Sequence, residues 1–253
     1  YLTMDVDTDG FSDLVYLEAP SLEEDPVVKV LMNAGSFTSP RFNRVVDTGI
    51  VLDCTSLASF DAKNWGFVFD YDLDGHQDIL LNWMDRDNWH VLLSDGSDSF
   101  NLRDTGVPRM ARALDGALKD GVTVADFNGD GLVDVLEGAR ENRELPGADE
   151  RWNNWYFRPL TEDGLGEALS VIEIPAVHAG DRPFHPLLIL DENGDGVSDM
   201  LFGYAGWLNY MSCTMVDEGS CHETDLPKKP YKDYLGPGAE IGTSEHKLTI
   251  DVN

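Results

Sequence analysis

Basic residues are scarce in this chain of 253 residues. It has 18 Lys and Arg against 47 Asp and Glu, which gives a formal net charge of −29 at pH 7. Because a surface of this sign repels phosphates, we expect no nucleic-acid partner and no anionic membrane partner. No apolar run is long enough to span a bilayer, and no signal peptide is visible. Hydrophobic residues still make up 42% of the chain, which predicts a folded protein with a core.

Cysteines and enzyme signatures are also scarce. Cys213 and Cys221 flank a turn-like segment, residues 217–220, and could either bridge a hairpin or remain buried free thiols. Cys54 has no evident partner. The chain lacks G-x-S-x-G, H-E-x-x-H, Walker and dinucleotide-binding motifs. We therefore expect no catalytic residues and no enzymatic activity in this chain, an expectation that does not extend to any domain outside it.

One acidic pattern, D-x-[DN]-x-D-G-x-x-D, is repeated. In Asp126–Asp134 the side chains of Asp126, Asn128, Asp130 and Asp134 can converge on one point, where they would repel one another without a cation. Ca²⁺ prefers six to eight oxygen ligands, and the carbonyl of Leu132 is the natural main-chain ligand. The glycine at position 6 is needed for a chain reversal, which predicts a positive φ there.

Recurrence makes this pattern informative, since Asp, Asn and Gly also form ordinary turns. Three further stretches fit it, and we number the four in chain order as loop 1 (Asp5–Asp13), loop 2 (Asp70–Asp78), loop 3 (Asp126–Asp134) and loop 4 (Asp191–Asp199). Loops 1 and 2 have Asp at position 3 where loops 3 and 4 have Asn. We therefore predict four Ca²⁺ sites of structural rather than catalytic type, the first two binding more strongly.

The loops are spaced like structural repeats. Their starts, with a truncated fifth at Asp251, are 65, 56, 65 and 60 residues apart. Periods in this range favour a propeller blade of four strands. In the second repeat the predicted strands are 64–69, 79–83, 89–94 and a fourth from 99, after an Asp-Gly hairpin turn. The other predicted strands are 14–17, 27–32, one restarting at 37, 122–125, 133–136, 152–157, 169–174, 187–190 and 200–204, followed by a hairpin between the two cysteines.

The remaining segments read as irregular. Residues 140–151 and 177–186 are polar and are expected to form rim loops, and residues 110–119 could form a short helix or a loop. The last seven residues, 247–253, resemble residues 1–7, so we expect this chain to be a piece of a longer protein.

An EF-hand is the main alternative for the loops. Residues 126–137 satisfy its spacing, with Glu137 at position 12. The other loops have Tyr16, Leu81 and Phe202 at that position, and their flanks are β-rich. We therefore interpret Glu137 as a chance match and exclude both EF-hand and dockerin-like folds, which need helices.

A D-x-[DN]-x-D-G-x-x-D loop between two strands, with a period near sixty, resembles the FG-GAP/VCBS repeats. These repeats form the β-propeller of integrin α subunits and of many secreted bacterial proteins. The Phe-Gly and Gly-Ala-Pro signatures are mostly missing, Phe202-Gly203 being the nearest, which favours the bacterial branch over an integrin subunit. In that branch such repeats occur in Rhs-type and toxin-complex shell proteins, adhesins and lectins.

The resemblance extends the same ligand positions to every loop. In loop 1 the implied ligands are Asp5, Asp7, Asp9, the Phe11 carbonyl and Asp13. In loop 2 they are Asp70, Asp72, Asp74, the His76 carbonyl and Asp78, with the His76 ring exposed. In loop 3 they are Asp126, Asn128, Asp130, the Leu132 carbonyl and Asp134. In loop 4 they are Asp191, Asn193, Asp195, the Val197 carbonyl and Asp199.

The expected fold class is therefore all-β: a β-propeller with four-stranded blades, of which at least four belong to a larger ring of about seven. The expected repeat units are approximately 1–63, 64–121, 122–186, 187–246 and the start of another at 247–253. The leading functional hypothesis is a calcium-stabilised, non-enzymatic scaffold for protein interaction or adhesion, secreted or on the cell surface. Its partner would be another protein or neighbouring domains of the same chain, as in a toxin-complex or Rhs-like shell.

Three alternatives stay open. A carbohydrate-binding propeller would use tryptophans to stack on a glycan, although aromatic residues in strands more often pack between blades. The tryptophans concerned are Trp65, Trp83, Trp89, Trp152, Trp155 and Trp207. An enzyme on a propeller scaffold would need carboxylates away from the loops. His178, Asp181 and His185 could bind zinc, but scattered histidines in a proline-containing loop are more often solvated.

Overall fold

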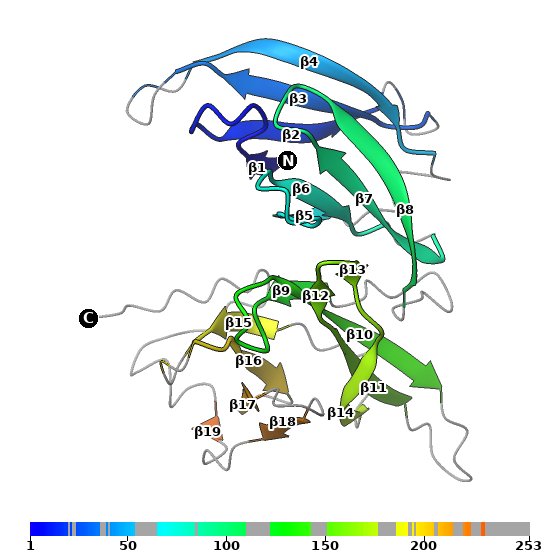
Figure 1. The fold of residues 1–253 in the computed structure, drawn as a ribbon. Helices are drawn as coiled ribbons and strands as arrows, with labels where there is room; N and C mark the ends of the chain where they lie inside the picture. The colour runs from blue at the N-terminus through cyan, green and yellow to red at the C-terminus, as the bar shows by residue number, and fades with distance from the viewer. Residues whose placement is uncertain are drawn as a thin grey trace. The chain divides into compact units, whose positions relative to one another are not determined.

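The computed structural model describes the chain in segments. These are residues 1–19, 21, 24–35, 39, 41–53, 65–83, 86–109, 122–142, 151–176, 186–191, 194, 196–204, 207–214, 220–223 and 229–230. All regular secondary structure within these segments is β-strand, so the prediction of an all-β fold is confirmed (Figure 1). The described part of the chain contains no helix suited to crossing a membrane.

The chain divides into two compact units. Unit 1 comprises Tyr1–Asp120 and Arg158–Ala168, and unit 2 comprises Gly121–Phe157 and Leu169–Asn253. Each unit contains two main antiparallel sheets, so each pairs two of the sequence repeats.

Unit 1 is built from two sheets whose strands pair in chain order. The first consists of β1 (Leu2–Met4), β2 (Asp13–Glu18), β3 (Val27–Asn33) and β4 (Phe42–Val51). The second consists of β5 (Gly66–Phe69), β6 (Asp78–Leu81), β7 (Asn88–Ser94) and β8 (Phe100–Pro108). A small hairpin, β12 (Leu160–Thr161) and β13 (Gly164–Leu165), also belongs to this unit. Loop 1 connects β1 to β2 and loop 2 connects β5 to β6.

Unit 2 repeats this plan. One sheet contains β9 (Val122–Ala125), β10 (Asp134–Asn142), β11 (Arg151–Arg158) and β14 (Leu169–Ala176), in the order β14-β11-β10-β9. The other contains β15 (Pro186–Leu190), β16 (Asp199–Tyr204), β17 (Trp207–Thr214) and β18 (Ser220–Glu223), and β19 (Lys229–Pro230) also pairs with β17. Loops 3 and 4 connect the first two strands of these sheets.

The strands of unit 1 enclose a hydrophobic core. Along β3, Val28, Val30 and Met32 are buried, as expected for a strand with alternating faces. All four residues of β6 are buried, so this strand is covered on both faces. The core cluster joins residues of both sheets, including Met4 and Ile79. Packing of the two sheets on each other therefore positions the ends of β1, β2, β5 and β6, where loops 1 and 2 begin and end.

The strand predictions hold for most of the described residues. The fourth strand of the second repeat, whose end the sequence left open, continues to Pro108. The expected polar loop 140–151 is shortened at both ends, because β10 continues to Asn142 and β11 begins at Arg151. Polar side chains do not prevent backbone pairing at strand tips, so polarity alone misplaced these ends.

Several predictions fall outside the described residues. They concern Cys54, the segment 110–119, residues 177–185 of the expected rim loop 177–186, and the terminal segment 247–253. The last residue of that rim loop, Pro186, begins β15 instead. The predicted cysteine hairpin is present as β17 and β18, whose register places Cys213 opposite Cys221.

The outer strands of unit 1 share a feature that the sequence analysis missed. β4 contains Asp47-Thr48-Gly49 and β8 contains Asp104-Thr105-Gly106, and both glycines have positive φ, +71° and +72°. The Thr48 hydroxyl donates to the Val28 carbonyl at 2.7 Å, and the Thr105 hydroxyl donates to the Trp89 carbonyl at 2.8 Å. The pairing register between β3 and β4, and that between β7 and β8, shifts beside these Asp-Thr-Gly segments. These are matching β-bulges, which bend the two outer strands in the same way.

Candidate metal centres

The four loops share their backbone conformation at position 6. Gly10, Gly75, Gly131 and Gly196 have φ values of +89°, +93°, +86° and +88°. The predicted chain reversal with positive φ is therefore confirmed in every loop. An L residue with a β-carbon rarely adopts this conformation, which is why glycine recurs here.

Position 4 is left-handed as well, which the sequence did not indicate. Gly129 and Gly194 have φ of +77°, as glycine readily allows. In loops 1 and 2 the same position is Thr8 at φ +58° and Leu73 at φ +61°. A left-handed conformation costs an L residue about 1–2 kcal/mol, so the contacts of these loops must impose it.

Those contacts come from the aspartate at position 1. Asp5 accepts hydrogen bonds from the N–H groups of Asp9 at 3.1 Å and Gly10 at 2.9 Å. Asp70 accepts from the corresponding residues of loop 2 at the same distances, 3.1 and 2.9 Å. In loops 3 and 4 the position-1 carboxylate instead accepts from the glycines at positions 4 and 6, at 2.6–3.0 Å. The backbone of each loop therefore folds around the carboxylate of its first aspartate.

Position 2 anchors the loop in the core. Val6, Tyr71 and Phe127 have exposed fractions of 0%, 2% and 0%. Their backbone N–H groups donate to the position-9 carboxylates of Asp13, Asp78 and Asp134, at 3.0, 2.8 and 3.0 Å. These hydrogen bonds join position 2 to position 9, so the two ends of each loop are held together. An apolar residue at position 2 was visible in loops 1 to 3 and could have been read as this anchor.

The position-9 aspartates of loops 1 to 3 are also buried. Asp13, Asp78 and Asp134 are exposed by 1%, 0% and 0%. Asp13 also accepts from the Asn33 N–H at 2.7 Å, and Asp78 from the Ser94 N–H at 2.8 Å. Asp13 and Asp78 therefore connect loops 1 and 2 to the end of the third strand in their sheets.

Burial raises the pKa of the position-9 carboxyls of Asp13 and Asp78. The pKa of Asp78 rises from 3.8 to about 6, chiefly through desolvation, with the charges of Asp72 and Asp74 adding to the rise. Hydrogen bonds from the Ser94 and Tyr71 N–H groups oppose it. The pKa of Asp13 is also raised, for the same main reason. A cation at these positions would favour the charged form and lower both values.

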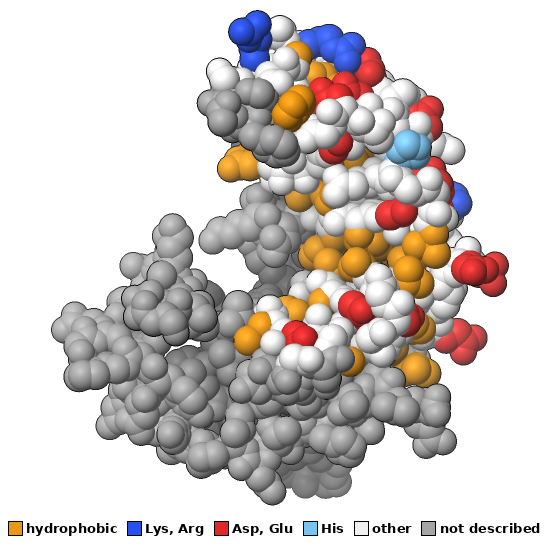
Figure 2. Space-filling view, turned by 60° about the vertical axis from the view of Figure 1, so that its left-hand side comes forward, with side chains coloured by type: hydrophobic (Ala, Val, Ile, Leu, Met, Phe, Trp, Pro, Cys, Tyr) orange, Lys and Arg blue, Asp and Glu red, His pale blue; other side chains and the backbone are white. Residues whose placement is uncertain are grey.

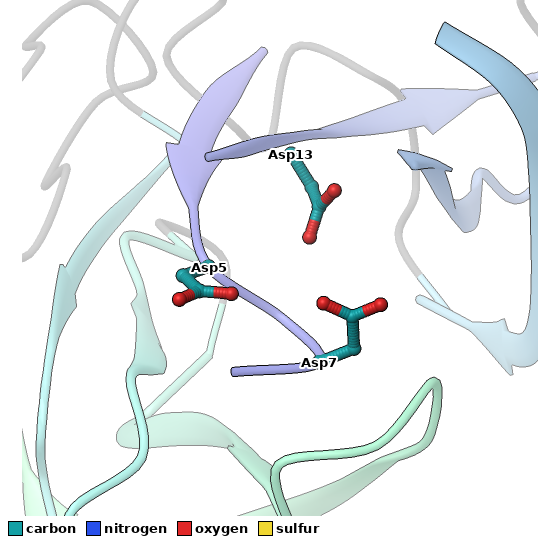
Figure 3. A group of neighbouring side chains, drawn as sticks. All are labelled: Asp5, Asp7 and Asp13. Atoms are coloured by element: carbon teal, nitrogen blue, oxygen red, sulfur yellow. The ribbon is translucent and has the colours of Figure 1, made fainter. Parts of the chain in front are cut away.

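Three carboxylates converge in loop 1 and three in loop 2. One oxygen each from Asp5, Asp7 and Asp13 lies within 4.8 Å of the other two. Figure 3 shows these three side chains directed toward a common space between β1 and β2. The matching residues of loop 2 are Asp70, Asp72 and Asp78, with the same limit of 4.8 Å.

These separations fit a hard cation. Ca²⁺ lies about 2.3–2.6 Å from each oxygen ligand, so ligands around one ion are separated by up to about 5 Å. The donors are all oxygens, which suits calcium rather than zinc. Residues at positions 1, 3 and 9 of loops 1 and 2 could therefore hold one ion in each loop.

The position-5 aspartates and the loop 3 residues make other contacts. The carboxylates of Asp9 and Asp74, at position 5, are not among the converging groups and accept from the N–H groups of Phe11 and His76, each at 2.8 Å. In loop 3, the Asn128 amide donates to Asp130 at 2.9 Å, and the N–H of Leu132 donates to Asp130 at 2.8 Å.

Loop 4 is described only in part. Asp191 caps the loop as described above, and Val197 is half-buried. Asn193 and Asp195 lie outside the described residues, and Asp199 begins β16.

The His76 side chain differs from the expectation, because it is half-buried. Its ring was expected to be exposed, yet its Nδ1 atom is buried and lacks a hydrogen-bond partner. A β-carbon added at Gly96 would lie 2.3 Å from the His76 ring. The imidazole therefore packs on the β7–β8 turn, where glycine provides the space.

The flanks of the loops exclude the EF-hand, as expected. Strands, not helices, precede and follow all four loops. Glu137 lies in β10, opposite Val122, and is fully buried in the sheet. The tryptophans of unit 1 bear on the glycan alternative, because Trp65, Trp83 and Trp89 are exposed by only 4%, 2% and 0%. None of these three offers a stacking surface for a sugar.

The middle of the chain matches a known protein family. Residues 70–137 match the family described as FG-GAP-like repeat. The match starts at the first aspartate of loop 2 and ends just beyond loop 3, so it contains two of the candidate metal centres. The resemblance to FG-GAP repeats is confirmed over this stretch. No curated protein matches the chain.

Proposed function

We propose that this chain is part of a calcium-stabilised β-propeller, a non-enzymatic scaffold for protein interaction outside the cell or on its surface. The observation that supports it most is the same three-carboxylate cluster at the same connection in two successive sheets. Four-stranded antiparallel sheets in repeated units and the FG-GAP-like match agree with propeller blades.

The metal has a structural role in this proposal. Each cluster gathers carboxylates that repel one another, and one of them is buried in the sheet. An ion that binds the folded loop and not the unfolded chain stabilises the fold, by about 2.7 kcal/mol at a free concentration one hundred times Kd. An affinity suited to extracellular calcium, about 10⁻⁴–10⁻³ M, would keep the loops occupied there and empty inside a cell.

The surface is consistent with a protein partner rather than a nucleic acid. On the face shown in Figure 2, acidic side chains are spread among hydrophobic ones, whereas Lys and Arg lie mostly at one end. A toxin-complex or Rhs-like shell is a setting in which such a scaffold would serve.

The test is thermal unfolding of the full chain after chelation, with and without added calcium. We expect calcium to raise the melting temperature and magnesium at equal concentration to raise it much less. Asp70→Asn combined with Asp72→Asn should remove part of the calcium-dependent rise. Asp163→Asn, an exposed turn aspartate outside the loops, is the matched control and should keep all of it. Identical melting with calcium and with chelator would refute the proposal.

A further inference from the structure

Consecutive loops within each unit touch at the same two positions. In unit 1 the backbone N–H of Asp5 donates to Oε1 of Gln77 at 2.9 Å. In unit 2 the backbone N–H of Ser198 donates to the carbonyl of Asp126 at 2.8 Å. Gln77 and Ser198 are the eighth residues of loops 2 and 4, and Asp5 and Asp126 are the first residues of loops 1 and 3.

The two contacts use different atoms and different residue types. One uses a side-chain acceptor and the other a backbone donor, so a shared local sequence does not explain their recurrence. Unit 2 adds a packing contact, because a β-carbon at Gly129 would lie 3.0 Å from the Val197 side chain. The recurrence therefore reflects how two neighbouring loops are placed.

Both ends of the contact adjoin candidate ligands. Gln77 lies between His76, whose carbonyl is a predicted ligand, and Asp78, whose carboxylate belongs to the loop 2 cluster. Asp5 is itself a member of the loop 1 cluster. An ion in loop 2 would fix the residues on either side of Gln77, and Gln77 holds the residue where loop 1 begins.

We propose that calcium binding is coupled in pairs, between loops 1 and 2 and between loops 3 and 4, through the contact of position 8 with position 1. This inference rests on the proposed function. An ion in loop 2 holds the Gln77 acceptor at the Asp5 N–H. Loop 1 therefore loses less conformational entropy when its own ion binds. The effect is reciprocal, since linkage requires each ion to favour the other by the same factor. One hydrogen bond at the surface corresponds to a factor of about two to five in affinity.

The experiment reads out each loop separately in the full chain. Hydrogen exchange of peptides covering residues 5–13 and 70–78 is measured against calcium concentration, which gives a protection midpoint for each loop. Asp70→Asn with Asp72→Asn disables loop 2 but keeps Asp78, which holds the N–H groups of Tyr71 and Ser94. We expect the loop 1 midpoint to rise about two- to fivefold in this variant.

Variants of Gln77 separate coupling from a general effect on stability. Gln77→Leu has similar size but no acceptor, so it should raise the loop 1 midpoint, and disabling loop 2 should then add nothing. Gln77→Glu keeps an acceptor oxygen and should keep the coupling. Ser12→Ala, at position 8 of loop 1, is the matched control and should leave the dependence of loop 1 on loop 2 unchanged.

Two outcomes would overturn the inference, and they are distinguishable. A loop 1 midpoint that does not respond when loop 2 is disabled would show independent sites and leave the proposed calcium role intact. An absence of calcium-dependent protection in both loops of the unaltered chain would refute the calcium role and the coupling together.

Discussion

Replacing Asp78 with asparagine should change how the calcium-free protein responds to pH. The Asp78 carboxylate is fully buried and lies near Asp72 and Asp74, and its pKa is raised from 3.8 to about 6. The folded state therefore binds a proton more readily than the unfolded state between these values. Stability from this group is fully present below pH 3.8 and is lost as the pH rises through about 6.

The magnitude follows from the size of the pKa change. At about 1.4 kcal/mol for each pKa unit, the rise from 3.8 to about 6 corresponds to about 3 kcal/mol in total, of which about 2 kcal/mol falls between pH 4 and pH 7. Asparagine does not titrate. The unfolding free energy of Asp78→Asn, relative to the unaltered chain, should therefore increase by about 2 kcal/mol from pH 4 to pH 7.

A constant offset is expected as well. Asparagine has one acceptor oxygen for two donors, the Tyr71 and Ser94 N–H groups, so one donor loses its partner. This should destabilise the variant by about 1–3 kcal/mol at every pH and leave the pH-dependent difference unchanged.

Urea denaturation in chelator at pH 4, 5, 6 and 7 measures this difference. Tryptophan fluorescence follows unfolding of the whole chain, and Trp65, Trp83 and Trp89, which are buried in unit 1, contribute to it. Asp163→Asn, an exposed aspartate of the same unit, should give a pH profile parallel to that of the unaltered chain. If the profile of Asp78→Asn is parallel too, the raised pKa of Asp78 is wrong. With saturating calcium the unaltered chain should instead lose stability toward low pH, because a bound cation favours the ionised carboxylate.

Four further changes test other parts of the structure. Leu73→Gly should raise the unfolding free energy by up to about 1 kcal/mol in urea denaturation, because φ at position 73 is +61°, whereas Gly129→Ala at φ +77° should lower it. Thr105→Val removes the hydrogen bond to the Trp89 carbonyl and should cost about 1 kcal/mol, measured in the same way. Cys213 and Cys221 are directly opposite in β17 and β18, so mild oxidation by a disulfide reagent should link them, detectable by peptide mass before and after reduction.

The sequence predicted the features that depend on local pattern. The aspartates and the glycine of each loop recur at fixed spacing, and a glycine that must reverse the chain is recognisable from that spacing alone. The strands on either side follow from apolar residues bounded by turns. This is why the all-β fold and the two carboxylate clusters of unit 1 could be anticipated.

Other features depend on contacts that the local pattern does not contain. The left-handed Thr8 and Leu73 follow from hydrogen bonds to the position-1 carboxylate, which override the preference of these residues. The contact between Gln77 and Asp5 joins residues 72 positions apart. The bulges of β4 and β8, by contrast, follow a repeated Asp-Thr-Gly that a comparison of the first two repeats could have found.

In both sheets of unit 1, each strand pairs with the strand that follows it in the chain. Closing a short connection between neighbouring strands has a small entropic cost, and folds made of such contacts form quickly. A sheet of this kind can assemble as soon as its own stretch of polypeptide has been synthesised, without waiting for distant segments. If the loops bind calcium as proposed, the strands of each sheet can therefore pair before the ion binds.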